Sequence, residues 1–87
     1  MENPYTENKI SKNTFIREFS QAIPSNEMVW HRDEEDRYIT CINECNWKIQ
    51  LDNELPKSIT ENTFIPKETY HRIIKGNGNL IIRIIKK

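Results

Sequence analysis

The sequence has little of several features that mark particular classes of protein. Only two cysteines, Cys41 and Cys45, occur in 87 residues, whereas a small secreted domain held by disulfides usually carries at least about four. No apolar run approaches the roughly 20 residues that span a bilayer, and the first part of the chain lacks the apolar core of a signal peptide. We therefore expect a soluble, cytoplasmic protein with no membrane partner.

An excess of charge of one sign is also missing. Thirteen Lys and Arg residues balance thirteen Asp and Glu residues, so the formal net charge is zero. This balance removes the usual electrostatic reason to expect nucleic acid or an anionic membrane as a partner. The only glycines, Gly76 and Gly78, fall in one turn, so the chain has neither a glycine-rich phosphate loop nor a Gly-x-Ser-x-Gly nucleophile elbow.

The residues that are abundant favour strands. The chain has fourteen isoleucines and one alanine, a composition that suits β-structure and argues against a helix bundle. Its length suits one domain. Residues 1–13 are polar and show no period, which predicts a flexible N-terminal tail or a loosely attached edge segment. Residues 14–87 are predicted to form a single β-barrel domain.

Strand signals recur at short intervals after the tail. Residues 14–23 fit either one amphipathic helical stretch or a short edge strand followed by a turn. Strands are predicted over residues 27–31, 37–43, 47–51, 54–59, 63–65, 70–74 and 80–85. The last is apolar on both faces and is expected at the centre of a sheet, and Gly76–Asn79 before it has the composition of a hairpin turn. Short strands separated by turns predict an all-β sandwich or barrel.

The candidate site lies within these strands. His31 and Asp33 are two positions apart on an extended segment, so both side chains point to one face. An acidic connector ends at Asp36, and Arg37 begins the next strand. His71, the second of the two histidines, starts a later strand that a barrel can bring close to His31.

Around these residues the sequence resembles the cupin family, small jelly-roll barrels that hold a metal or a small polar ligand in the barrel mouth. The first cupin motif, His-x-His with a following Glu, corresponds to Trp30–Arg37. The second motif, which runs from Gly-Asp through Pro-x-Gly to a His, corresponds to Thr60–His71, and Asn43–Trp47 resembles the turn between them. The resemblance covers residues 23–85 and implies a small cupin-like jelly-roll fold and a homodimer.

The departures from the motifs bear on the site. His31 and His71 match the first and last histidines, and Asp33 stands in the place of the second. A carboxylate still binds a metal, whereas Arg37, in the place of the family's Glu, cannot. Thr60 and Glu68 stand where the family has glycines.

Two interpretations of the site stay open. In the first, His31, Asp33 and His71 hold a divalent metal such as Fe, Mn, Ni or Zn as a 2-His-1-carboxylate set, and Asp36 can replace Asp33. In the second, no metal is present, and Arg37 clamps a small anionic ligand. Gln50 is a further polar contact to a ligand in either case. The residues assigned to ligand binding are therefore Arg37, Asp36 and Gln50.

The class of function follows from the same alternatives. With a metal, the protein is either a binder of small molecules or a metal-assisted enzyme for oxygenation, isomerisation or decarboxylation. Without one, it is a binding or sensing module, or a structural interaction domain with a filled barrel. Trp30 and Trp47 are expected in the core or a dimer interface, Cys41 is expected as a small buried residue, and Cys45 as part of a turn.

Overall fold

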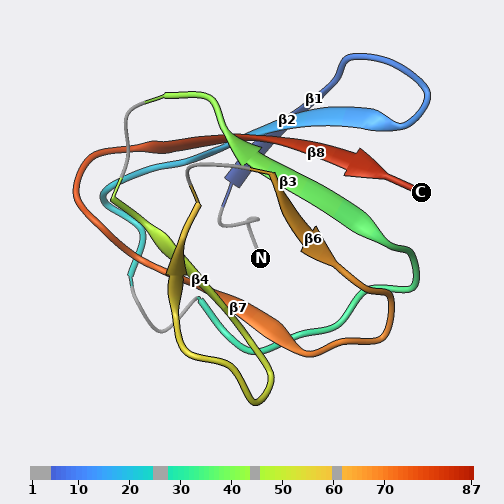
Figure 1. Ribbon diagram of the computed structural model, residues 1–87. Coiled ribbons are helices and arrows are strands. Elements are labelled where there is room, and N and C mark those ends of the chain that lie inside the picture. Colours follow the sequence, from blue (N-terminus) through green and yellow to red (C-terminus); the bar gives the residue numbers. More distant parts are fainter. Residues whose placement is uncertain (1–4, 25–27, 44–45, 60–61) are drawn as a thin grey trace.

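A computed structural model describes residues 5–24, 28–43, 46–59 and 62–87 of the chain (Figure 1). These residues form eight strands: β1 (Tyr5–Lys9), β2 (Thr14–Phe19), β3 (Arg37–Cys41), β4 (Lys48–Leu51), β5 (Lys57–Ser58), β6 (Thr63–Ile65), β7 (His71–Ile74) and β8 (Leu80–Lys86). No helix that could cross a membrane occurs within these ranges. The predicted all-β class is confirmed.

The strands form two antiparallel sheets. The larger sheet has the order β1-β2-β8-β3-β6, and the smaller has the order β5-β4-β7. Figure 1 shows the two sheets wrapping around a common interior, with β8 and β3 on one side and β4 and β7 on the other. Their buried side chains form one core cluster, as expected for a jelly-roll barrel in which each strand turns one face inward.

Alternation along the strands builds this core. On β8, Leu80, Ile82 and Ile84 are buried, and the residues between them face away from the core. β8 lies between β2 and β3 at the centre of the larger sheet, as its apolar composition predicts. On the smaller sheet, Ile49 and Leu51 of β4 are buried on the same face, so side chains from both sheets close the interior.

The two tryptophans, both expected in the core or a dimer interface, differ in burial. Trp47 is completely buried, and its indole Nε1 donates a hydrogen bond to the Gly78 carbonyl at 3.1 Å. Trp30 is 41% exposed, and its ring lies against the Arg72 guanidinium. Trp47 is therefore a core residue and Trp30 is a surface residue. Cys41 is half-buried and packs against the core, while Cys45 lies outside the described residues.

The N-terminal part of the chain contains an edge strand. Residues 5–9, for which the sequence left a flexible tail and an edge segment open, form β1 at the edge of the larger sheet and pair with β2 from Tyr5 opposite Phe19 to Lys9 opposite Phe15. Residues 14–19 are a strand and not a helix. They are also not at the edge, because β1 covers one side of β2 and β8 the other. The hydrogen-bonded ladders on both sides satisfy the backbone groups that a helix would otherwise pair internally.

The predicted hairpin at Gly76–Asn79 is also wrong. β7 pairs with β4, and β8 pairs with β2 and β3, so this turn carries the chain from one sheet to the other. Each glycine of this turn is needed for a different reason. A Cβ on Gly76 would lie 2.7 Å from the Asn46 carbonyl carbon, which only a glycine avoids, and Gly78 has a φ of 74°, in the left-handed region that glycine favours.

Candidate metal centre

Two histidines from distant parts of the chain face each other across an antiparallel bridge. The His31 N–H donates to the His71 carbonyl at 3.0 Å, and the His71 N–H donates to the His31 carbonyl at 2.8 Å. Residues paired in this way project their side chains from the same face. The two imidazole rings accordingly meet edge to face with their centroids 4.3 Å apart, although forty positions separate the residues in the sequence.

Asp33 joins the two histidines from the segment that follows His31. Its side chain points to the same face because it is two positions further along extended backbone. The Asp33 carbonyl accepts a hydrogen bond of 2.7 Å from the Glu68 N–H, which fixes this segment against the turn before β7. Glu68 has a φ of 60°, so the turn keeps the left-handed conformation for which the cupin motif supplies a glycine.

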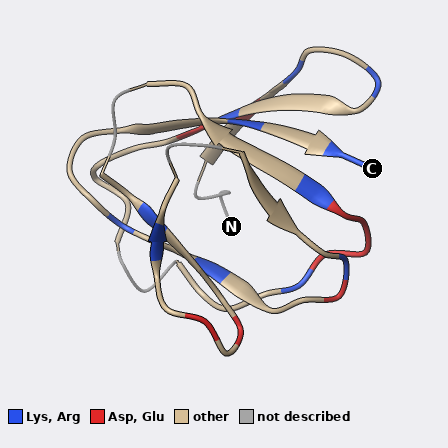
Figure 2. Ribbon diagram, in the orientation of Figure 1, with Lys and Arg blue, Asp and Glu red and all other residues tan. Residues whose placement is uncertain are grey.

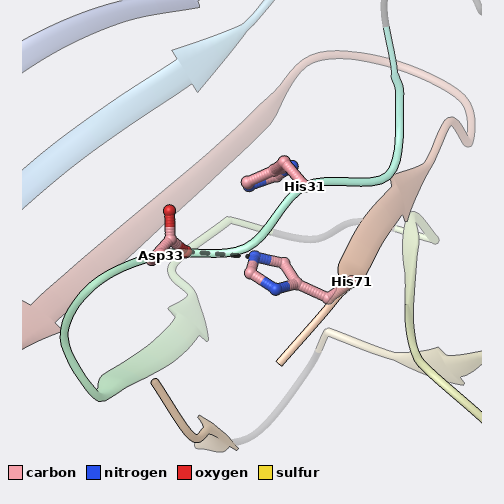
Figure 3. Close-up of side chains that lie close together, drawn as sticks. All are labelled: His31, Asp33 and His71. Atoms are coloured by element: carbon pink, nitrogen blue, oxygen red, sulfur yellow. Dashed lines mark ion pairs between the residues drawn. The ribbon is translucent and has the colours of Figure 1, made fainter. Parts of the chain in front are cut away.

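Potential ligand atoms converge on one point (Figure 3). One atom from each of His31, Asp33 and His71 lies within 4.8 Å of the others, and the Asp33 Oδ2 is 3.2 Å from the His71 Nε2. His71 is buried, Asp33 is partly buried, and His31 is exposed to solvent. The centre is therefore closed on the His71 side and open on the His31 side.

Backbone carbonyls orient both imidazoles. The His71 Nδ1 lies 2.8 Å from the Thr69 carbonyl, and the His31 Nδ1 lies 3.2 Å from the Val29 carbonyl. A carbonyl only accepts, so in each neutral ring Nδ1 carries the proton and Nε2 keeps its lone pair. Metal-binding histidines are commonly fixed in this tautomer by such a partner.

The Asp33 Oδ2 then faces another acceptor. This oxygen is buried and has no hydrogen-bond donor within the described part of the chain, while the nearest ring nitrogen, the His71 Nε2, presents a lone pair. Two acceptors 3.2 Å apart repel each other unless a cation or proton lies between them. The donor set of two imidazoles and one carboxylate fits a divalent transition metal.

The protonation of His71 agrees with this arrangement. Burial lowers the pKa of His71 from its ordinary value of 6.5, and electrostatic interactions with the neighbouring His31 and with Arg37 lower this pKa further. The hydrogen bond to the Thr69 carbonyl and the charge of Asp33 act in the opposite direction. The net lowering keeps the imidazole neutral near pH 7, which is the form that binds metals.

Arg37 holds the carboxylate and does not face the metal position as a ligand. Its Nη2 lies 3.3 Å from the Asp33 Oδ1 and 2.7 Å from the Glu35 Oε1, and its Nε donates to the same Glu35 oxygen at 2.9 Å. Figure 2 shows acidic residues on the connector that leads into the basic start of β3. The two carboxylates thus more than offset the buried guanidinium charge, and the contact with Arg37 orients Asp33 toward His71.

Two residues predicted at the site lie elsewhere. Gln50 is on the face of β4 opposite to the buried Ile49 and Leu51, where it accepts a hydrogen bond from the Arg72 Nε at 3.0 Å. The Asp36 Oδ1 accepts from the Lys67 backbone N–H at 2.8 Å, so this carboxylate fixes a turn. Neither residue lines the cavity beside the histidines, which leaves Asp33 as the carboxylate of the set.

A cavity of about 410 Å³ opens beside this centre. His31, Asp33, Arg37 and His71 line one part of it, and Arg17 of β2 lines another. Arg17 was not predicted at the site, because the segment around it was open to a helical interpretation. Strand alternation between Phe15 and Phe19 is the signal that places Arg17 on the inward face.

Comparison with known proteins finds similarity in structure only. No family model and no curated protein matches the chain. A cobalt(II) form of HppE in complex with Tris buffer is 10% identical and has a TM-score of 0.73. The similarity covers 100% of this chain but only 55% of the HppE chain. A further similar structure is of Fe(II)-HppE with an alternative substrate.

Two smaller structures are similar over most of their length. An RmlC-like cupin family protein with a double-stranded β-helix fold from Methanocaldococcus jannaschii is 15% identical, with a TM-score of 0.65, over 98% of this chain and 81% of that one. A cupin domain from Bordetella pertussis Tohama I is 15% identical, with a TM-score of 0.60, over 100% and 98%. The chain therefore has a cupin-like fold, as its motifs indicated.

Proposed function

We propose that this protein binds a small polar or anionic molecule in the mouth of its barrel through a divalent metal held by His31, Asp33 and His71. The observation that carries the proposal is the buried Asp33 Oδ2, which has no donor among the residues that the structure describes and lies 3.2 Å from the His71 Nε2. A cation between these atoms satisfies both. The Co(II) and Fe(II) forms of the structurally similar HppE support the same class of metal.

The chain's own residues supply the rest of the binding site. Three protein ligands leave coordination positions open, and the exposed His31 places them toward the mouth. Arg37 orients Asp33 through their 3.3 Å contact. When bound, the metal would polarise an oxygen of a carbonyl or carboxylate ligand as a Lewis acid.

The metal-free alternatives have less support. As an anion clamp, Arg37 would need free donors, but two of its nitrogens already contact Glu35 and Asp33. A purely structural domain with a filled barrel does not account for the cavity of about 410 Å³. Cavities of roughly 300–1,000 Å³ are typical of small-molecule sites, so a ligand-binding role fits this interior better.

Metal content tests the proposal directly. Untagged protein is expected to contain Fe, Mn, Ni or Zn near one equivalent per chain by inductively coupled plasma mass spectrometry, or to take up one equivalent when these ions are added. The His31→Ala/His71→Ala double variant should contain less than about a tenth of that amount, because removing two of three ligands leaves no chelating set. Wild-type protein that stays empty after addition of each metal would contradict the proposal.

We also propose that the protein is a homodimer. On the outward face of the larger sheet, Tyr38 and Phe64 pair side by side with ring centroids 5.0 Å apart, and Phe64 is 43% exposed. Ile42, at the end of β3, is 51% exposed. Small domains bury a limited fraction of their surface and gain stability by association, and exposed aromatic side chains are enriched in interfaces.

Light scattering after size-exclusion chromatography should therefore give twice the chain mass for the wild-type protein and a single chain mass for Phe64→Glu. A charge placed in a buried apolar contact has a large desolvation cost. Leu55→Glu is the matched control, because Leu55 is 85% exposed and precedes β5 of the smaller sheet. A monomeric wild-type protein, or a dimer that Phe64→Glu leaves intact, would refute this interface.

A further inference from the structure

Arg17 is the second arginine that lines the cavity, and it is partly buried. It lies on β2 opposite Ile82 of β8. Ile82 is 1% exposed, and residues directly opposite on paired strands share a face, so the Arg17 side chain points inward and is only 13% exposed. A charged side chain at such a position needs partners that offset its desolvation.

The partners of Arg17 hold its guanidinium but do not use all of its donors. Its Nε donates to the Glu7 Oε1 of β1, and its guanidinium carbon lies 4.2 Å from the centroid of the Tyr5 ring. Glu7 is the inward residue directly opposite Arg17 on the β1–β2 ladder. The terminal nitrogens of Arg17 have no acceptor within the described part of the chain. A guanidinium presents five donors in a fixed plane. The edge that carries the terminal nitrogens therefore remains for a ligand.

Arg17 differs in this respect from Arg37. The Nη2 of Arg37 contacts both Asp33 and Glu35, and its Nε contacts Glu35, so a ligand anion there would meet a site of net negative charge. Among the described residues, Arg17 has a single carboxylate partner, Glu7, whose side chain is 31% exposed and whose charge is therefore partly screened by water. An anion that enters the cavity is consequently attracted more strongly to Arg17.

Much of the remaining lining of the cavity is apolar. It includes Phe19, Met28, Ile82 and Ile84, of which Phe19, Ile82 and Ile84 belong to the core cluster. The cavity thus combines the Arg17 guanidinium, hydrocarbon surface and the His31–Asp33–His71 set in one lining. A molecule that matches these groups has a carboxylate, a short aliphatic body, and an oxygen that can bind a metal.

We propose that Arg17 binds the carboxylate of a short aliphatic acid whose other end reaches the metal centre. The inference rests on the proposed function for the metal-bound end of the ligand, but the role of Arg17 is tested separately. The carboxylate accepts hydrogen bonds from the terminal nitrogens of Arg17, the contact that is strongest when both groups are charged. The aliphatic body lies against Phe19, Met28 and Ile82.

The test uses defined probes on the full chain. Straight-chain carboxylic acids from acetate to hexanoate, and their ω-hydroxy derivatives, are titrated into protein with and without added Mn(II) or Zn(II), and binding is followed by calorimetry and by the melting temperature. Primary alcohols of the same length serve as uncharged probes. Affinity is expected to rise about fourfold per methylene, the transfer free energy of one CH₂ group, until the cavity is full. The alcohols should bind at least about tenfold more weakly than the acids.

Variants assign the effect to Arg17. Arg17→Met, which keeps most of the length of the side chain, should weaken acid binding by about 10- to 100-fold, as expected for loss of a charged hydrogen-bonding partner, and should leave metal content unchanged. Arg83→Met is the matched control, since Arg83 lies between the buried Ile82 and Ile84 on β8 and points away from the core. The Glu7→Gln/Arg17→Met double variant removes the carboxylate that the single change leaves unpaired, and it should give the same loss of acid binding.

The outcomes separate the two proposals. Protein that binds one equivalent of metal but binds no acid, or binds acids equally well as Arg17→Met, overturns the role of Arg17 and leaves the metal site standing. Protein that takes up no metal but binds acids in an Arg17-dependent manner supports Arg17 and refutes the metal centre. A preference for ω-hydroxy acids over plain acids only when metal is present would support both ends of the proposed ligand.

Discussion

Asp33→Ala should lower the affinity of the protein for Mn(II) or Zn(II) by at least about 100-fold. Loss of a partner that only orients a ligand typically costs about 10- to 100-fold, and Asp33 is itself one of the three groups whose donor atoms lie within 4.8 Å. Its removal leaves two imidazoles, which cannot offset the charge of a divalent cation. Isothermal titration with each metal, on protein first stripped with a chelator, measures the change.

Glu35→Ala is the matched control for this experiment. Glu35 and Asp33 both contact the Arg37 guanidinium, at 2.7 and 3.3 Å, but only Asp33 faces the histidines. We expect Glu35→Ala to change metal affinity by less than about tenfold, because Arg37 then keeps Asp33 as its partner. Equal losses in the two variants would mean that the carboxylates act through Arg37, and Asp33 would no longer be assigned as a ligand. Far-UV circular dichroism of both variants confirms that the comparison is between folded proteins.

The part of this centre that the sequence predicts is the part that depends on local geometry. His31 and Asp33 share a face because extended backbone alternates with a period of two. His71 was assigned by the resemblance to the cupin motifs, since no local rule states which residue of a distant strand lies opposite His31. The structure supplies that information as the bridge between His31 and His71. Register between distant strands depends on the whole set of packed side chains.

The predictions for Gln50 and Asp36, which do not line the cavity, differed from the structure for different reasons. Gln50 alternates with Ile49 and Leu51, which the sequence already placed on the apolar face, so its outward orientation on β4 followed from the same pattern. Asp36 lies in an irregular connector where no period applies. Its carboxylate is held by the Lys67 N–H, a contact from a turn that is distant in the sequence, and nothing in the sequence indicates that pairing.

Arg17 was missed, and the N-terminal segment was not distinguished from a tail, because polar residues interrupt the apolar pattern there. β2 reads Phe15, Arg17, Phe19 on its inward face, and an arginine at the middle position hides the alternation that identifies a strand. β1 has four exposed residues of five, as is common at sheet edges, and such a strand has the composition of a tail. Strands that carry polar groups into a site or lie at an edge are therefore the hardest to predict from pattern.

Trp47→Ala is expected to have the largest effect on stability. The side chain is completely buried, and its ring contacts Phe19 with centroids 6.1 Å apart. Truncation of a buried tryptophan costs about 3–5 kcal/mol, because the transfer free energy is lost and a cavity remains. A domain of this length is stable by about 4–13 kcal/mol, so the variant should be strongly destabilised. Urea unfolding followed by far-UV circular dichroism measures the loss without relying on tryptophan fluorescence.

Trp30→Ala provides the comparison within the same chain. Trp30 is 41% exposed, and its recorded ring contact is with the Arg72 guanidinium at 4.9 Å, an interaction worth about 0.5–1 kcal/mol at an exposed site. The loss of stability in Trp47→Phe should fall between those of the two alanine variants. This variant keeps an aromatic ring in the core but loses the hydrogen bond to the Gly78 carbonyl. If Trp47→Ala and Trp30→Ala lowered the free energy of unfolding equally, the indole of Trp47 would not be the centre of the core between the sheets. The packing between the two sheets would then have to depend on the remaining side chains of the core cluster.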